Sequence, residues 1–178
     1  AVNLIFDLAK SDFVALFDSD DESYLNRISN QFNLFNKNFQ YNRNTIVLGS
    51  RNVISKNNTK IKKSVGCLNP ANQLEILEKC LLPRQTIFNG NLFGSGSLFC
   101  NVKLFKEIGG FDPTLIRLAE IDFWIKATFN NIQLVSTNKP VIDSYKSDNL
   151  LPYRTEKIIN QSIRKIYKRY SYLFISER

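Results

Sequence analysis

Continuous apolar runs alternate along this chain with segments whose apolar residues recur at helical spacing. The clearest run, Phe13–Phe17, is apolar at every position, as in a central strand that is buried on both faces. Because strands and helices alternate, the pattern favours an α/β sheet flanked by helices. We predict strands at Asp12–Asp18, Thr45–Ile54, Ser97–Val102, Ile132–Ser136 and Pro140–Asp143, and helices at Ala1–Lys10, Glu22–Asn36, Pro70–Leu82, Lys103–Ile108, Leu118–Phe129 and Thr155–Tyr172.

The predicted helix at 22–36 is amphipathic. Its apolar residues recur at helical spacing, so we expect one face to pack on the sheet. The expected buried positions are Leu25, Ile28, Phe32 and Phe35. A later helix is closed by Gly109-Gly110, and we expect one of these glycines to take the left-handed conformation of a helix C-cap. The polar, basic segment Asn57–Ser64 is predicted to be a loop.

The composition is that of one globular domain. The chain has 178 residues, of which 43% are hydrophobic, and it contains no apolar run of about 18 residues that would span a membrane. Histidine is absent, which excludes a histidine base. Cys67, Cys80 and Cys100 match no zinc or CxxC spacing, so we interpret them as buried free thiols in a reducing compartment. The start of the chain resembles no secretory signal.

The net charge of +8 is concentrated in two segments, Ser55–Ser64 and Arg154–Tyr170. No nucleic-acid-binding motif accompanies them, so we expect no nucleic-acid partner. We divide the chain into a main domain, 1–150, and a basic amphipathic C-terminal helix, 151–178. The helix places its apolar residues on one face, where it either packs on the domain or contacts an anionic membrane surface. These residues are Ile159, Ile163, Ile166 and Tyr170.

Three aspartates, Asp18, Asp20 and Asp21, follow the first predicted strand in the segment FVALFDSDDESYL. Carboxylates this close repel one another, so a positive partner is expected beside them. Ligands of α/β sheets gather at the carboxyl ends of strands, and two carboxylates two residues apart can share one Mg²⁺ or Mn²⁺ ion. The alternative is that Asp21 only caps the following helix.

A second acid pair, Glu120 and Asp122, opens the predicted helix at 118–129. A carboxylate at a helix N-terminus is stabilised by the helix dipole, so capping alone would explain the pair. An acid at that position is also suited to act as a general base if it faces a bound phosphate. The neighbouring Phe123, Trp124 and Ile125 are interpreted as core residues.

The order FVALFDSDD, EIGGFDPTL and AEIDFWIKA resembles the family 2 glycosyltransferases of the GT-A fold. The resemblance covers the chain up to about Tyr145. It implies a Rossmann-related mixed sheet flanked by helices, and a chain that enters the family's pattern after its first nucleotide-binding strands, as an N-terminally truncated fragment. It also implies that Asp18 and Asp20 hold Mn²⁺ or Mg²⁺ on the diphosphate of a sugar nucleotide, with Asp21 facing the donor sugar or supporting the loop.

The same resemblance implies that Glu120 deprotonates the acceptor, with Asp122 as the alternative base because the family's Glu-Asp pair is here Ala119-Glu120. It places Gly94–Ser97 near the donor sugar, where a plain turn is the alternative. The implied activity is metal-dependent, inverting transfer from a UDP-linked sugar to a glycan or lipid-linked acceptor in surface polysaccharide synthesis. The implied location is the cytoplasm or the inner face of the membrane.

Two other classes of function are weighed against this one. Haloacid dehalogenase phosphohydrolases also end a strand in D-x-D, but they continue with Thr or Val, whereas Asp21-Glu22 follows here. A non-catalytic basic module would bind a membrane or nucleic acid through the segment Arg154–Tyr170, and its binding would be sensitive to salt.

Overall fold

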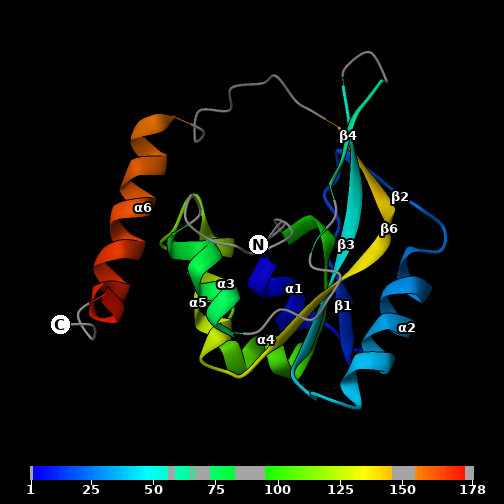
Figure 1. The fold of residues 1–178 in the computed structure, drawn as a ribbon, viewed down its shortest axis with the longest axis horizontal. Coiled ribbons are helices and arrows are strands. Elements are labelled where there is room, and N and C mark those ends of the chain that lie inside the picture. Colours follow the sequence, from blue (N-terminus) through cyan, green and yellow to red (C-terminus); the bar gives the residue numbers. More distant parts are fainter. Residues whose placement is uncertain are drawn as a thin grey trace.

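A computed structural model describes residues 2–55, 59–64, 66, 73–82, 95–145 and 155–174 (Figure 1). A mixed sheet crosses the molecule, with helices on both of its faces, and the C-terminal helix α6 stands apart from the sheet beyond α3 and α5. The predicted α/β class is confirmed. The strands are β1 (Phe13–Ala15), β2 (Asp21–Ser23), β3 (Thr45–Ile54), β4 (Lys60–Ser64), β5 (Leu98–Asn101) and β6 (Gln133–Tyr145).

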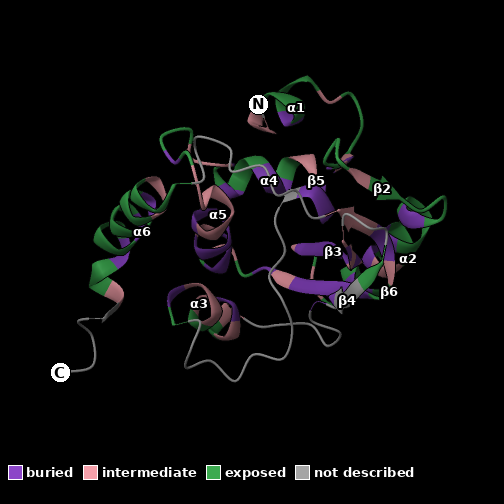
Figure 2. Ribbon diagram, turned by 90° about the horizontal axis from the view of Figure 1, so that it is seen from above, coloured by how far each residue is buried: buried purple, intermediate pink, exposed green. Residues whose placement is uncertain are grey.

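The sheet follows the order β1-β5-β3-β6-β2, and β4 pairs with β3 beside this path. β5 is antiparallel to both β1 and β3, whereas β3 and β6 are parallel. β1, β3 and β6 therefore point the same way. β1 ends at Ala15, which is level with Val47 of β3, whereas β3, buried in the middle of the sheet (Figure 2), continues with β6 as far as Ile54 and Tyr145. Ligands of α/β sheets gather on the side of the sheet toward which such strands point.

The two faces of the sheet bury different helices. α2 (Arg27–Phe39) covers one face, where Phe35 packs against Val47, Phe99 and Val135. On the other face, α1 (Val2–Leu8), α3 (Gln73–Leu81), α4 (Val102–Ile108) and α5 (Ala119–Thr128) enclose the larger core. Successive side chains along each strand point to opposite faces of the sheet, so each strand contributes residues to both cores. The larger core contains Phe6, Val14, Leu16, Ile46, Leu48, Ile76, Leu98, Cys100, Leu104, Phe105, Phe123, Trp124 and Leu134, among others.

The C-terminal helix α6 (Glu156–Tyr170), which continues into the 3-10 turn Ser171–Phe174, packs against α3 and α5. Ile166 and Tyr170 are buried against Leu81, Leu115 and Ile125. The apolar face of the basic helix therefore contacts the protein itself. No helix in the described ranges is long and apolar enough to span a membrane.

Several element boundaries differ from the predictions. The strand predicted at 12–18 is only three residues long, Phe13–Ala15. The helix predicted from Glu22 begins at Arg27, because Asp21–Ser23 forms β2. Part of the predicted loop 57–64 is strand β4, and the two strands predicted at 132–143 are one strand, β6. A shift in register beside Ser50 and Pro140 lets the pairing of β3 with β6 continue past the proline.

The predicted buried face of α2 is wrong for three of its four residues. Phe35 is buried, but Leu25, Ile28 and Phe32 are 108%, 51% and 40% exposed. The helix is rotated so that a mixed polar and apolar face meets the sheet. That buried face consists of Arg27, Gln31, Phe35 and Asn38.

Two local predictions are confirmed. Gly109 caps α4 in the left-handed conformation, with φ of 91°. Cys80 and Cys100 are free thiols; Cys100 is fully buried, and burial raises the pKa of its thiol. Cys67 and Pro70 lie outside the described residues.

Candidate functional site

The acidic segment Asp18–Asp21, which we call the acid loop, is a tight turn. The backbone N–H of Asp21 donates to the carbonyl of Asp18 at 3.1 Å, and Asp, Ser and Asp are residues that such turns favour. The turn holds its three carboxylates close together between β1 and β2. The alternative role of Asp21 as a helix cap is wrong, because Asp21 belongs to β2 and the N-cap of α2 is Asn26.

The acid loop lies between the carboxyl end of β1 and that of β6. It follows β1 after Leu16 and Phe17, and Asp21 pairs with Ser144 near the end of β6. Two further contacts join β2 and the residue after it to β6. Tyr145 donates to Glu22 at 2.9 Å, and Tyr24 donates to Asp143 at 2.9 Å. The loop is thereby fixed at both of its ends.

Gly96 provides the space that Asp18 occupies. A Cβ atom added at Gly96 would lie 2.5 Å from Cγ of Asp18, so no larger residue fits while the carboxylate stays in place. Gly96 belongs to the short 3-10 turn Ser95–Ser97 ahead of β5. The predicted proximity of Gly94–Ser97 to the site is met at Gly96, whereas Gly94 lies outside the described residues.

A buried guanidinium lies behind the acid loop. Arg27 is 2% exposed, and its Nη2 donates to the carbonyl of Leu16 at 2.5 Å and to that of Gly96 at 3.3 Å. Its carbon Cζ lies 5.8 Å from the centre of the Phe17 ring. Burial lowers the pKa of Arg27 to about 10, while Asp18 and Asp21 act in the opposite direction. Arg27 thus joins the backbone at Leu16 to the backbone at Gly96, and both lie close to Asp18.

Gln31 extends this support into the sheet. It accepts from Nε of Arg27 at 2.9 Å and donates to the carbonyls of Ser97 at 2.9 Å and Val47 at 3.4 Å. Arg27 and Gln31 are one helical turn apart, so both reach the sheet from the same face of α2. Together they connect the ends of β1, β5 and β3 through α2.

Two carboxylates of the acid loop, those of Asp18 and Asp21, have raised pKa values. Burial, followed by repulsion from Asp20, raises the pKa of Asp18, and Arg51 and Arg27 offset part of this effect. Burial also raises the pKa of Asp21 more than its hydrogen bond to Ser144 lowers it. Hard oxygen donors that repel one another fit a divalent cation such as Mg²⁺ or Mn²⁺. In the described part of the chain, no group of three or more Asp, Glu or Cys residues is arranged so that it could hold a metal ion by itself.

The second acid pair lies on a separate element, the first turn of α5. Glu120 is half-buried there, and among the described residues its carboxylate has no hydrogen-bond or ion-pair partner. Phe123, Trp124 and Ala127 of α5 share the larger core with Val14 and Leu16, which precede the acid loop. The structure thus brings Asp18, Asp20 and Asp21 together and holds Glu120 on a helix of the same core.

Asp122 is fully buried and surrounded by positive and hydroxyl groups. Its Oδ1 accepts from Arg169 at 2.5 Å and from Tyr170 at 2.9 Å, and its Oδ2 lies 3.3 Å from Nζ of Lys126. Arg169 also forms an ion pair with Asp112. These contacts fix α6 against α5, so Asp122 has a structural role in this fold.

The prediction from sequence missed the residues that support the site. Arg27, Gln31, Phe35 and Asn38 recur at helical spacing as regularly as the apolar positions that we chose. An arginine and a glutamine one turn apart at the start of a helix, directly after three acids, was the available signal. Hydrophobic periodicity alone gives such polar positions no weight.

Comparison with known proteins supports the resemblance. The chain is 32% identical over 119 residues to an uncharacterized glycosyltransferase of Rickettsia felis, a match that covers 66% of this chain. Among solved structures it resembles S. aureus TarS, residues 1–349, with a TM-score of 0.56 at 15% identity over 92% of this chain. The chain therefore shares the fold of the TarS structure, the mixed α/β sheet that the resemblance implied. No protein-family model matches it.

The match of this chain to these proteins is partial in length. It spans 18% of the length of the R. felis protein and 42% of the TarS chain. TarS has also been solved in complex with UDP-GlcNAc, where the TM-score is 0.55, and in complex with UDP, where it is 0.52. At 15% identity these structures establish the fold of the domain.

Proposed function

We propose that this domain takes part in glycosyl transfer from a nucleotide-diphosphate sugar, with UDP as the nucleotide, to a glycan or lipid-linked acceptor. The observation that carries the proposal is the acid loop between the carboxyl ends of β1 and β6, held in place by Arg27. The named relative is a glycosyltransferase, and TarS binds UDP and UDP-GlcNAc, which support the same donor class here.

In this proposal Asp18 and Asp20 hold Mn²⁺ or Mg²⁺, and Asp21 supports the loop or faces the donor sugar. A divalent cation at this position would offset the charge that develops on the diphosphate leaving group. The contribution of the chain is to hold the carboxylates in place before the ligand arrives. Arg27, Gln31 and Gly96 keep the loop in that position, which lowers the cost of ordering it on binding.

We assign the general base to Glu120 rather than to Asp122. Asp122 is occupied by Arg169, Tyr170 and Lys126, whereas the carboxylate of Glu120 has no such partner among the described residues. Glu120 accepts the proton of the acceptor hydroxyl as its oxygen bonds to the anomeric carbon. The bond from that carbon to the diphosphate breaks on the opposite side, so the configuration inverts.

The acceptor and the membrane contact extend this proposal. A role in surface polysaccharide synthesis places the acceptor at a membrane. The basic residues of α6 that face solvent, Arg164, Lys165 and Lys168, would then contact anionic lipid while Ile166 and Tyr170 hold the helix on the domain.

The test is a thermal-shift titration with UDP, with and without Mn²⁺, on the wild-type chain and on Asp20→Ala. Ligand at a hundred times its Kd should add roughly 2.7 kcal/mol of stability to the wild type. The shift should require Mn²⁺ and disappear in Asp20→Ala, while Asp7→Ala, which removes an exposed acid from α1, should keep it. An equal shift in Asp20→Ala, or no shift in the wild type, would contradict the proposed site.

A further inference from the structure

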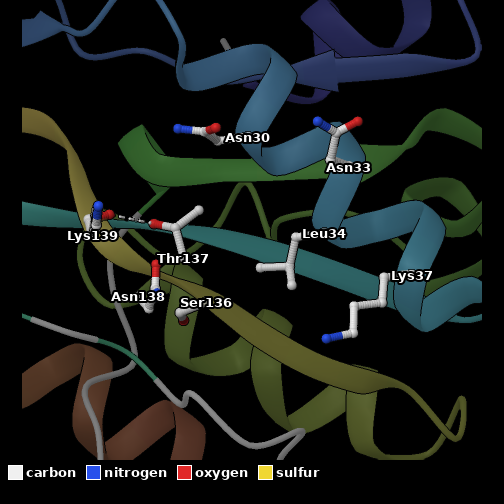
Figure 3. Close-up of a pocket in the computed structure, with 8 residues that line it drawn as sticks. All are labelled: Asn30, Asn33, Leu34, Lys37, Ser136, Thr137, Asn138 and Lys139. Carbon is white, nitrogen blue, oxygen red and sulfur yellow. Dashed lines mark hydrogen bonds between the residues drawn. The ribbon is translucent and has the colours of Figure 1, made fainter.

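A groove of about 720 Å³ runs between α2 and β6, on the face of the sheet opposite the larger core (Figure 3). This volume lies within the usual range of ligand sites. Figure 3 shows the side chains of α2 along one side of the groove and those of β6 along the other, with β3 between them. The lining residues are Asn30, Asn33, Leu34 and Lys37 of α2, and Ser136, Thr137, Asn138 and Lys139 of β6.

The lining of this groove is polar and positively charged. It contains three amide side chains, two hydroxyls and two ammonium groups, and no carboxylate is among them. An asparagine amide both donates and accepts, so it pairs well with the hydroxyls of a sugar, whereas lysine supplies charge without accepting. The lining thus suits a ligand that carries many hydroxyls and also a negative charge.

Both walls of the groove are fixed by contacts elsewhere in the fold. On β6, Thr137 accepts from the backbone N–H of Ser50 at 2.8 Å and donates to the carbonyl of Lys139 at 2.9 Å. Ser136 is 3% exposed and belongs to the floor. On α2, Arg27 and Gln31 attach the helix to the sheet. A ligand would therefore meet a surface that is already formed.

The lining residues also argue against two classes of ligand. It contains no aromatic residue on which a nucleobase would stack, which argues against single-stranded nucleic acid. Its one aliphatic residue, Leu34, is too little for an acyl chain. We propose that the groove binds an anionic glycan through Asn30, Asn33 and Asn138, with Lys37 and Lys139 contacting its acidic groups.

The choice of a glycan rests on the proposed glycosyl transfer, whereas the preference for a negative charge rests on the lining alone. Asn30 is three residues from Arg27, or roughly 4.5 Å along the helix axis. The groove therefore begins within one turn of the side chain that supports the acid loop and extends along α2.

The test is calorimetric titration of the full chain with a galacturonate hexamer, with neutral maltohexaose and with polyphosphate as a pure anion. Binding should follow the order hexagalacturonate over maltohexaose, and Lys37→Ala/Lys139→Ala should weaken it roughly fivefold, as expected for two exposed charge contacts. Lys103→Ala/Lys157→Ala removes the same charge from α4 and α6, which lie on the opposite face of the sheet from the groove, and should leave binding unchanged. Equal weakening by the two double variants would overturn the inference.

Asn33→Ala distinguishes a glycan site from a general anion site. It should weaken binding of the galacturonate hexamer and leave that of polyphosphate unchanged, because only the sugar uses the amide. Hexagalacturonate binding that is no tighter than that of polyphosphate and is unchanged in Asn33→Ala would overturn the glycan assignment. The UDP shift should be unchanged in every groove variant, so a failure of the groove and a failure of the donor site give different results.

Discussion

The two acidic regions of this domain place their charges in opposite ways. In the acid loop, the carboxylates face outward and one cation, Arg27, is buried behind them. At α5, one carboxylate, Asp122, is buried, and the cations that surround it reach solvent, with Lys126 and Arg169 24% and 40% exposed. In the sequence the two regions look alike, because each has two acids separated by one residue at the boundary of a helix or strand.

The difference shows what distinguishes a functional acid from a structural one. Asp122 has its partners within the fold, so its charge is already used to join α6 to α5. Asp18 and Asp21 are held where burial and mutual repulsion disfavour their charge, so a cation from outside would relieve them. Carboxylates whose ionised form is disfavoured within the fold are candidates for a functional site.

The variant with the largest expected effect on stability is Asp122→Ala. It leaves Arg169, Lys126 and Tyr170 without their shared partner, and loss of one member of a buried charge network should cost about 4 kcal/mol of unfolding free energy. Urea denaturation measures the loss. Glu120→Ala on the same turn should change stability by less than about 0.5 kcal/mol, and an equal loss in both variants would contradict the distinction.

Arg27→Met should destabilise the domain by about 3 kcal/mol, because it leaves the carbonyls of Leu16 and Gly96 without a donor. Arg27→Lys, which keeps the charge but loses the forked geometry, should recover part of this stability. Urea denaturation without ligand measures the stability of both variants. A loss below about 0.5 kcal/mol in Arg27→Met would show that the loop does not depend on this cation.

Gly96→Ala should cost only about 1 kcal/mol of stability, because the carboxylate of Asp18 can rotate away from the new methyl group. It should nevertheless abolish the Mn²⁺-dependent response to UDP. Gly109→Ala is the matched control, since it places the same methyl group in a left-handed C-cap, where there is open space around it. That variant should lose similar stability and keep the response, and a retained response in Gly96→Ala would contradict the placement of Asp18.

The two regions should also respond to pH with opposite signs, although the effects are small. Burial alone would raise the pKa of Asp112, but its hydrogen bonds with Arg169 and Thr114 outweigh it and lower the pKa to about 2. Its contribution is therefore present above its ordinary pKa of 3.8 and lost as pH falls toward 2. The raised pKa of Asp18 has the opposite consequence, since its ionised form becomes a cost as pH rises through the folded pKa.

In metal-free buffer, Asp112→Asn should lower the Tm at pH 7 by an amount that shrinks toward pH 2. Asp18→Asn should raise the Tm at pH 7 and have no effect at pH 3. Thermal melts of both variants across this range test the comparison. Changes of the same sign at pH 7 would show that the two regions are not electrostatically distinct.

Much of the fold was predictable because apolar patterning reports burial directly. The core strands β3 and β5 and the apolar face of α6 with Ile166 and Tyr170 follow from it, whereas the C-cap at Gly109 follows from the glycine pair. Patterning left open whether that face of α6 packs on the domain or on a membrane. Patterning failed at α2, where the carbonyls of Leu16 and Gly96 lie beneath the helix and need donors. Buried acceptors are paired, so Arg27 and Gln31 face the sheet while Ile28 is exposed.

The candidate site was predictable in its residue types and only partly in its arrangement. The clustering of Asp18, Asp20 and Asp21 follows from turn-forming residues after an apolar run. The structural role of Asp122 depends on Arg169 and Tyr170, which lie 47 and 48 residues away along the chain. Contacts at such separation are set by how α6 docks, which local patterns do not report.

The most direct test is a Mn²⁺ titration of the ¹⁵N-labelled chain, followed by paramagnetic broadening of its backbone amide signals. We propose that Asp18 and Asp20 bind the cation, so broadening should begin at Asp18–Asp21 and Gly96. It should be absent from the same signals in Asp20→Ala. The amides at the start of α6, which Figure 1 shows on the far side of the molecule from β2, should stay sharp. Broadening that begins at α5 and α6, or that is unchanged in Asp20→Ala, would contradict the assignment of the acid loop as the cation site.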